Sequence, residues 1–168
     1  ARLSLFVGLT ATTLHVLVAA LIGGTAGFLG GRFDLVVQRF VDAWMAIPGL
    51  LLLLTIMSLT GPGLVQIILV LGISSGITNS RVVRSAVIAI KENDYFQAAR
   101  AVGASKSRIF FRHVLPNIMP PIIIIFSITL GAIIVAEASL SFLGFGLPTT
   151  VPSWGGMLSR EGRQYMTI

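Results

Sequence analysis

Residues 94–116 read DYFQAARAVGASKSRIFFRHVLP and separate two strongly apolar segments of the chain. Four basic residues lie in this polar stretch: Arg100, Lys106, Arg108 and Arg112. Loops that only reverse the direction of a chain are usually short. This one is long, and Gly103 divides it into two helix-forming runs. We therefore interpret it as a docking element at the surface of a membrane protein.

The composition points to the lipid bilayer. Of 168 residues, 55% are hydrophobic and only 11% are charged, and the mean hydropathy is +0.93, whereas soluble domains carry about 25% charged residues. The net charge is +6. Because the basic residues lie between apolar runs, with no basic face interleaved with aromatics, we expect no nucleic-acid partner. The chain has no cysteine, which excludes a thiolate metal site, a disulfide and a catalytic thiol.

Four apolar segments predict an all-α bundle of four membrane-spanning helices, at about 20 residues for each span. The segments cover residues 3–31, 35–59, 64–90 and 116–142. Turns are expected at residues 30–34 and 61–63, and Pro48 is expected to kink the second helix near its middle. Gly23 and Gly27 give the first segment a small face that suits close helix packing in lipid.

Basic residues are distributed unevenly between the two sides of this bundle. Nine of the twelve Lys and Arg lie in or beside the first and third connections: Arg32, Arg39, Arg81, Arg84, Lys91, Arg100, Lys106, Arg108 and Arg112. The positive-inside rule therefore predicts that residues 94–116 are cytoplasmic and that the tail, residues 144–168, is extracytoplasmic. Arg81 and Arg84 are interpreted as marking the edge of the membrane.

The polar stretch contains a long gapped pattern. Gln97-Ala98-Ala99 is followed after three residues by Gly103, after nine more by His113, and after one more by Leu115-Pro116. This pattern resembles the EAA loop of bacterial ABC-importer permeases, which has Glu, Ala, Ala, Gly, Ile, Leu and Pro at the same spacing. Gln97 stands where the pattern has Glu, and His113 stands where it has Ile, so a salt bridge from that Glu is not available here.

The resemblance implies a coupling helix that seats in a groove of an ATPase subunit and transmits its closure to the membrane helices. The residues expected to act in this coupling are Asp94, Tyr95, Phe96, Gln97, Ala98, Ala99, Arg100, Gly103, Ala104, Leu115 and Pro116. The plainer alternative is a solvated basic loop with no coupling role.

A second resemblance covers almost the whole chain. Residues 136–146, AEASLSFLGFG, and residues 152–158, PSWGGML, are similar to the dipeptide, oligopeptide and nickel branch of these permeases. The resemblance implies a single transmembrane permease domain, residues 1–168, of the type I ABC-importer kind, with one further helix before it and one after it. It also implies a bacterial inner-membrane location.

The same resemblance implies the partners. They are a second homologous permease subunit, two cytoplasmic ATPase subunits, an extracytoplasmic substrate-binding protein and membrane lipid. The chain itself is expected to be a transport subunit and no enzyme, with no cofactor of its own, because ATP and Mg²⁺ are used by the ATPase subunits. Nickel or glutathione remains open as the cargo in place of peptides.

Glu137 is the only acid in the fourth apolar segment. An acid inside a span is costly and usually faces protein or water. We predict that Glu137 and Ser139 line the translocation path, with a carboxylate that hydrogen-bonds a neighbouring helix as the alternative. His15 and His113 lie too far apart in sequence and topology to suggest a metal pair, and we expect no metal site.

Two other classes of membrane protein remain open from the residues. An ion-driven secondary transporter often combines broken helices with a membrane-embedded acid such as Glu137, but it leaves the spacing of residues 97–116 unexplained. A non-transporting scaffold would need the loop for assembly and not for flux.

Overall fold

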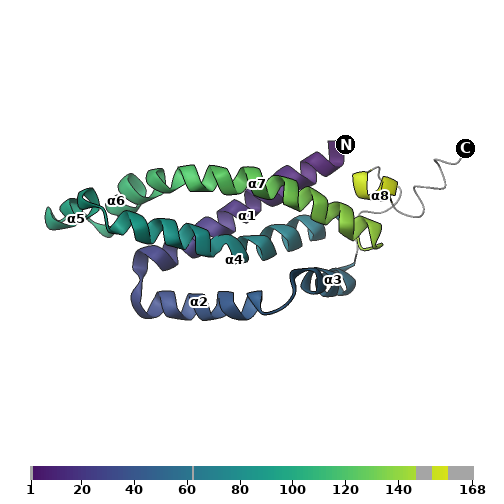
Figure 1. Ribbon diagram of the computed structural model, residues 1–168, viewed down its shortest axis with the longest axis horizontal. Coiled ribbons are helices and arrows are strands. Elements are labelled where there is room, and N and C mark those ends of the chain that lie inside the picture. Colours follow the sequence, from purple (N-terminus) through teal and green to yellow (C-terminus); the bar gives the residue numbers. More distant parts are fainter. Residues whose placement is uncertain (1, 62, 147–152, 159–168) are drawn as a thin grey trace, which may run out of the picture.

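The structure is a computed structural model that describes all residues except 1, 62, 147–152 and 159–168. Every regular element in these described residues is helical: α1 (Arg2–Leu29), α2 (Gly31–Met45), α3 (Gly49–Thr60), α4 (Leu64–Lys91), α5 (Asp94–Ala101), α6 (Lys106–Ile109), the π-helical turn η1 (Phe110–Val114), α7 (Leu115–Phe142) and α8 (Trp154–Leu158). Figure 1 shows α1, α4 and α7 as an elongated bundle, with α5 and α6 at one end and α3 and α8 at the other.

Three of the described helices are long and apolar enough to cross a membrane: Arg2–Leu29, Leu64–Lys91 and the continuous helix Lys106–Phe142. The predicted all-α membrane bundle is confirmed. The predicted second span, however, is not one kinked helix. It consists of α2 and α3, which meet at an angle of 83° and make a fourth crossing only if both count as one span. Pro48 directly precedes α3. It lacks an amide hydrogen and keeps its predecessor out of helical geometry, which allows either a kink or a full break, and the structure has the break.

Two predicted boundaries were also wrong. The turn expected at residues 30–34 is confined to Gly30 and Gly31, which have φ angles of 67° and 59°, and α2 begins at Gly31. The fourth membrane helix does not begin at Pro116 but at Lys106, and it runs through η1 into α7 without interruption. The polar sequence after Gly103 hid this start, because the first turns of the helix project beyond the apolar span.

Glycines bring α1 and α4 together, and these two helices form the most extensive helix pair in the described chain. Gly23 and Gly27 lie on α1, and Gly72 and Gly76 lie on α4. A Cβ atom at Gly23 would overlap the backbone carbonyl oxygen of Ser80 on α4. A Cβ atom at Gly27 would lie 2.9 Å from the backbone carbonyl oxygen of Arg84, also on α4. Small residues four apart allow such close approach in lipid, as predicted for α1.

The buried apolar residues form two clusters, one toward each end of the bundle. The cluster beside α5 contains Val87, Phe96, Ile109 and Val114, which come from four different elements. The cluster beside α3 is built around residues such as Leu140 of α7. Large apolar side chains are also exposed along the outside of α1, α3 and α7, as expected for surfaces that face lipid or further helices.

The predicted tail, residues 144–168, is described only at residues 144–146 and 153–158. In this part α8 folds back over the ends of α1 and α7. The amide of Trp154 donates a hydrogen bond of 3.1 Å to Ser4 Oγ, and Gly155 packs closely against Ala138 and Ser141. The remainder of the predicted tail lies outside the described residues.

Candidate functional site

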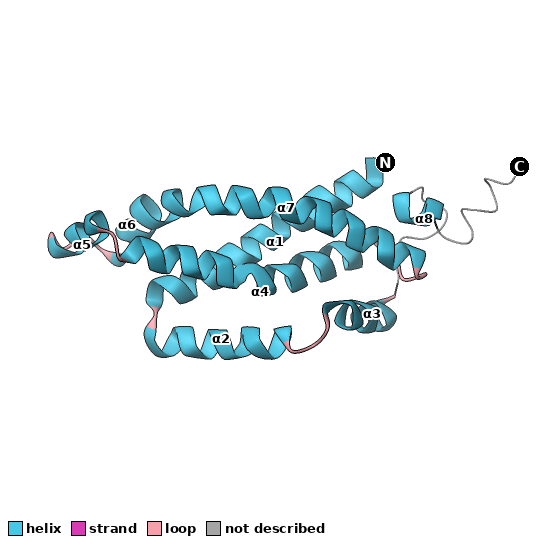
Figure 2. Cartoon of the chain, in the orientation of Figure 1, coloured by secondary structure: helices cyan, strands magenta, loops and turns pink. Residues whose placement is uncertain are grey.

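The predicted docking segment forms one end of the bundle, where α5 turns into α6 (Figure 2). α5 begins after Asn93, whose carbonyl oxygen accepts hydrogen bonds from the amides of Phe96 (3.0 Å) and Gln97 (3.3 Å). Asp94 lies in the first turn and Arg100 in the last. Both charges are placed favourably for the helix dipole, so the local sequence itself specifies a short helix here.

The glycine of the sequence pattern ends α5 in a Schellman motif. Gly103 has a φ of 76°, and its amide donates to the Arg100 carbonyl oxygen at 3.0 Å. The amide of Ala104 donates to the Ala99 carbonyl oxygen at 3.1 Å. These are the two hydrogen bonds of that motif, which needs a left-handed residue at the glycine position. The fixed spacing between Ala99 and Gly103 therefore has a backbone explanation.

The inner face of the segment is anchored in the core. Phe96 of α5 and Ile109 of α6 are each only 3% exposed, and both belong to the cluster that includes Val87 of α4 and Ile118 of α7. Ala99 and Ala104 pack against the same cluster. Phe96 therefore ties α5 to a core that it shares with two long membrane helices, α4 and α7.

The outer face of α5 presents small and apolar side chains to solvent. Ala98 and Ala101 are exposed, Tyr95 is 41% exposed, and Val102 is 84% exposed. These residues are three or four positions apart and share one face of the helix. A helix with an alanine at the centre of its exposed face lets another protein surface approach its backbone closely.

The two residues that depart from the EAA pattern both have partners in the structure. The Gln97 side-chain amide donates a hydrogen bond of 2.8 Å to the carbonyl oxygen of Lys91 at the end of α4. A glutamate at this position is unable to donate when ionised. His113 lies beside Tyr95, with 6.3 Å between the ring centroids. The amide of Gln97 thus ties α5 to α4 without a salt bridge.

Leu115 and Pro116, the end of the pattern, lie inside the continuous helix just after η1. In a π-helical turn the backbone hydrogen bonds join residues five apart and not four apart, and such turns inside α-helices are frequent at functional sites. Proline removes a further amide donor. These two features give the helix an irregular backbone where it leaves the docking segment.

Three basic side chains of α4, Lys91, Arg84 and Arg81, make polar contacts with α1 and α2 that escaped the sequence analysis. Lys91 Nζ donates to the carbonyl oxygens of Gly27 (3.0 Å) and Phe28 (3.1 Å), which belong to the last turn of α1. Arg84 pairs with Asp34 through two hydrogen bonds of 2.5 Å.

Arg81 pairs with Asp42, which also lies 3.6 Å from Arg39. Arg81 and Arg84 therefore fasten α2 to α4, in addition to any place at the membrane edge. The sequence held a signal for these two ion pairs. Arg81 and Arg84 are three positions apart, and Asp34 and Asp42 are eight apart, so each pair lies on one face of its helix.

Glu137 and Ser139 lie far from the docking segment, near the opposite end of α7. Glu137 is fully buried, and one of its carboxylate oxygens accepts a hydrogen bond of 2.9 Å from Ser141 Oγ. The other oxygen has no partner among the described residues. Ser139 donates to the carbonyl oxygen of Val135 on its own helix at 2.9 Å. Residues two apart point to different faces of a helix, so a shared role in the translocation path stays a prediction.

The part of the chain that the structure describes contains no group of three or more His, Cys, Asp or Glu side chains placed to hold a metal ion. The arrangement at α5 combines an exposed face of small and apolar residues with a buried anchor, Phe96.

Comparison with known proteins places this chain in a family. Residues 19–162 match the model of the family described as "binding-protein-dependent transport system inner membrane component". The chain belongs to this family. It is therefore a multi-pass inner-membrane protein, in agreement with its long apolar helices.

Individual members of this transport family agree over nearly the whole chain. The oligopeptide transport system permease protein OppC of Bacillus subtilis (strain 168) is 38% identical over 95% of the chain. The dipeptide transport system permease protein DppC of the same organism is 40% identical over 94% of it. The glutathione transport system permease protein GsiD of Pectobacterium atrosepticum is 34% identical over 99%.

The chain spans about half the length of these curated relatives, between 49% and 55%. Residues 97–116, 136–146 and 152–158 indicated a resemblance to the dipeptide, oligopeptide and nickel branch of the ABC-importer permeases. The family match and these relatives confirm it.

Proposed function

We propose that the chain is the membrane-spanning part of a permease subunit in an ATP-driven importer of dipeptides or oligopeptides. The observation that carries the proposal is the two-sided construction of α5. Its outer face exposes Ala98, while Phe96 on its inner face is buried among side chains of α4 and α7. The family match and the names of the peptide permeases support it.

The mechanism follows from this construction. Closure of a pair of ATPase subunits moves the groove that holds α5, and Phe96 transfers the movement to α4 and α7 through the shared core. Interior packing is dense and transmits such shifts between rigid helices. Gly103 fixes the angle at which α5 leaves the bundle. ATP is hydrolysed, with Mg²⁺, in the ATPase subunits, so this chain needs no catalytic residue.

The assembly completes the transport path. A second homologous permease subunit pairs with this one, and the exposed apolar faces of α1 and α7 provide surface for it and for lipid. The positive-inside rule supports placing α5 and two ATPase subunits on the cytoplasmic side. A substrate-binding protein delivers cargo on the other side, at the α8 end of the bundle.

The test uses the backbone requirement at Gly103. A side chain at this position meets no atom within 4 Å, so only the φ of 76° opposes substitution. Left-handed geometry costs an ordinary residue about 1–2 kcal/mol, whereas Asn adopts it more readily. In the full-length subunit with its ATPase partners, Gly103→Val is expected to lose peptide-stimulated ATP hydrolysis, and Gly103→Asn is expected to retain most of it.

Docking itself is tested on the exposed face. Ala98→Trp is expected to abolish co-purification of the ATPase subunits, because the bulky ring holds the partner away from the helix. Ala98→Ser, at the same place, is expected to retain it. If both Gly103→Val and Ala98→Trp leave binding and hydrolysis unchanged, α5 is not the coupling element.

Glutathione is the alternative cargo, because one relative is named a glutathione permease. The same ATPase assay separates the two cargoes when it is run with dipeptides, oligopeptides and glutathione, each delivered by its binding protein.

A further inference from the structure

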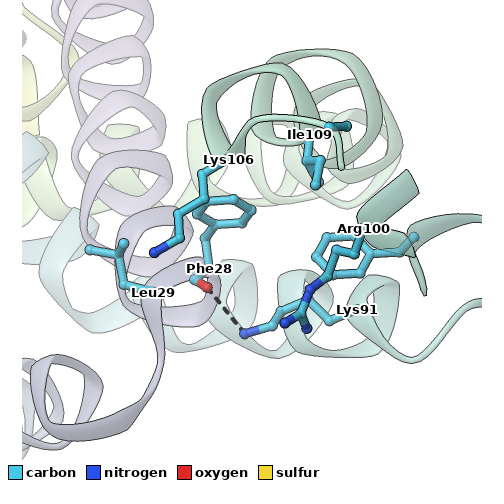
Figure 3. Close-up of a pocket in the computed structure, with 8 residues that line it drawn as sticks. Phe28, Leu29, Lys91, Arg100, Lys106 and Ile109 are labelled. Carbon is cyan, nitrogen blue, oxygen red and sulfur yellow. Dashed lines mark hydrogen bonds between the residues drawn. The ribbon is translucent and has the colours of Figure 1, made fainter. Parts of the chain in front are cut away.

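A basic cavity of about 390 Å³ lies between α5, α6 and the end of α1. Three cationic side chains line it, together with apolar side chains: Lys91, Arg100 and Lys106, with Phe28, Phe96 and Ile109. Figure 3 shows the guanidinium of Arg100 beside the amino group of Lys91, whereas the amino group of Lys106 lies on the other side of Phe28, toward Leu29. No acidic residue lines this cavity. It is therefore suited to an anion.

Two of the three basic side chains have no ion-pair or hydrogen-bond partner among the described residues. Lys91 is bound to the carbonyl oxygens at the end of α1. Arg100 and Lys106, in contrast, form no ion pair or side-chain hydrogen bond with any other residue that the structure describes. Both side chains are exposed, and apolar side chains line the cavity beside them.

An apolar groove continues from the cavity along the outside of the bundle. The groove has a volume of about 240 Å³ and shares Phe28, Leu29 and Lys106 with the cavity. Phe110 and Phe111 extend it along η1. Leu29 is 55% exposed and Phe111 is 63% exposed. Lys106 therefore lies where the basic cavity meets the apolar groove.

We propose that this composite site binds one anionic phospholipid, with its phosphate in the basic cavity and the upper part of an acyl chain in the groove. Basic pockets between membrane helices at the cytoplasmic side suit anionic head groups. A free phosphate ion leaves the groove unexplained. An acidic side chain of an ATPase subunit fits less well, because Phe96 puts the cavity on the inner face of α5, whereas the docking face carries Ala98 on the other.

Bound there, the lipid bridges α1 to the docking segment. The phosphate contacts Arg100 of α5 and Lys106 of α6, and the chain packs on Phe28 of α1. The lipid would hold α5 at a fixed distance from the membrane surface. This role depends on the family's membrane location and not on which cargo the protein carries.

The test compares two double variants of the full-length permease in detergent. Arg100→Gln with Lys106→Gln removes two charges from the cavity. Arg108→Gln with Arg112→Gln removes the same charge from exposed side chains of the same segment that line neither the cavity nor the groove. Binding of single phosphatidylglycerol molecules is measured by native mass spectrometry, with phosphatidylcholine as the neutral lipid.

We expect the first double variant to lose about 30-fold in phosphatidylglycerol affinity, since each basic residue near an anionic lipid contributes about a fivefold factor. The second is expected to stay within about twofold of the parent, because its charges lie outside the site and are screened. An equal loss in both variants would show unspecific charge attraction and overturn the proposal.

Two further arms separate the possible occupants. Inorganic phosphate is expected not to displace phosphatidylglycerol at equal concentration; efficient displacement would show a phosphate site and overturn the lipid assignment. If the cavity variant keeps its phosphatidylglycerol affinity but no longer co-purifies with the ATPase subunits, the occupant is an acidic side chain of the partner. A thermal unfolding scan of both variants confirms that each protein is folded.

Discussion

Replacing Gly23 with alanine tests the packing on which the whole bundle depends. The new Cβ atom would overlap the carbonyl oxygen of Ser80 and would lie 2.9 Å from the amide nitrogen of Arg84. Both neighbours are backbone atoms of α4, so no side chain is able to move aside. Since non-bonded heavy atoms prefer about 3.5–4.0 Å, α1 and α4 have to separate by at least about 1 Å.

The cost follows from that separation. A gap of about 1 Å forfeits about half of the dispersion energy along the contact, and over-packing typically costs about 1–3 kcal/mol. We therefore expect Gly23→Ala to lower the free energy of unfolding by about 2 kcal/mol. For a chain of this size that corresponds to a fall of about 4–8 °C in the unfolding temperature, measured on the purified permease in detergent.

Gly24 provides a matched control in the next position of the same helix. A Cβ atom at Gly24 meets only the ring of Phe110, at 3.8 Å, which is an ordinary contact. Gly24→Ala is expected to leave the unfolding temperature unchanged or to raise it, because alanine favours the helix by up to about 1 kcal/mol. If Gly23→Ala is as stable as Gly24→Ala, the close approach of α1 and α4 is refuted.

Three further changes probe the docking segment and its supports. Phe96→Ala removes a buried ring, at a cost of about 3–5 kcal/mol, and is expected to speed hydrogen exchange in α5 far more than Tyr95→Ala on the exposed face; equal rates would show that Phe96 is no anchor. Asp34→Asn leaves the partly buried Arg84 without its ionised partner. We expect it to lower the free energy of unfolding by about 2 kcal/mol, a value between those typical of exposed and of buried ion pairs. Arg39→Gln breaks an exposed ion pair and is expected to lower it by less than about 1 kcal/mol, measured by thermal unfolding. Gln97→Glu, once ionised, loses the donor to the Lys91 carbonyl oxygen and is expected to weaken ATPase coupling. Unchanged ATP hydrolysis would separate that hydrogen bond from function.

The docking segment shows how far the sequence led. The spacing from Gln97 to Pro116 predicted a helix, a glycine bend and a second helix, and the structure has α5, Gly103 and α6 in that order. Local interactions explain this success, because a Schellman motif is specified by neighbouring residues. The start of the fourth membrane helix at Lys106 was missed, since apolar patterning marks only the part of a helix that lies in lipid.

The second predicted span failed for a related reason. A proline inside an apolar run is compatible with a kink or with a break, and the sequence around Pro48 does not distinguish them. The choice is made by tertiary contacts. Arg84 and Arg81 of α4 hold α2 in place through Asp34 and Asp42, while α3 joins the cluster at the other end of the bundle.

The sequence by itself determined the membrane setting, the helical class and the family, because composition, hydrophobic run length and motif spacing are properties of neighbouring residues. Only the tertiary structure decided which side chains share a place. It put Phe96 in one core with Val87, and it gathered Lys91, Arg100 and Lys106 around one cavity. These groups come from α4, α5 and α6, so their meeting depends on how separate helices pack against one another and not on neighbouring residues.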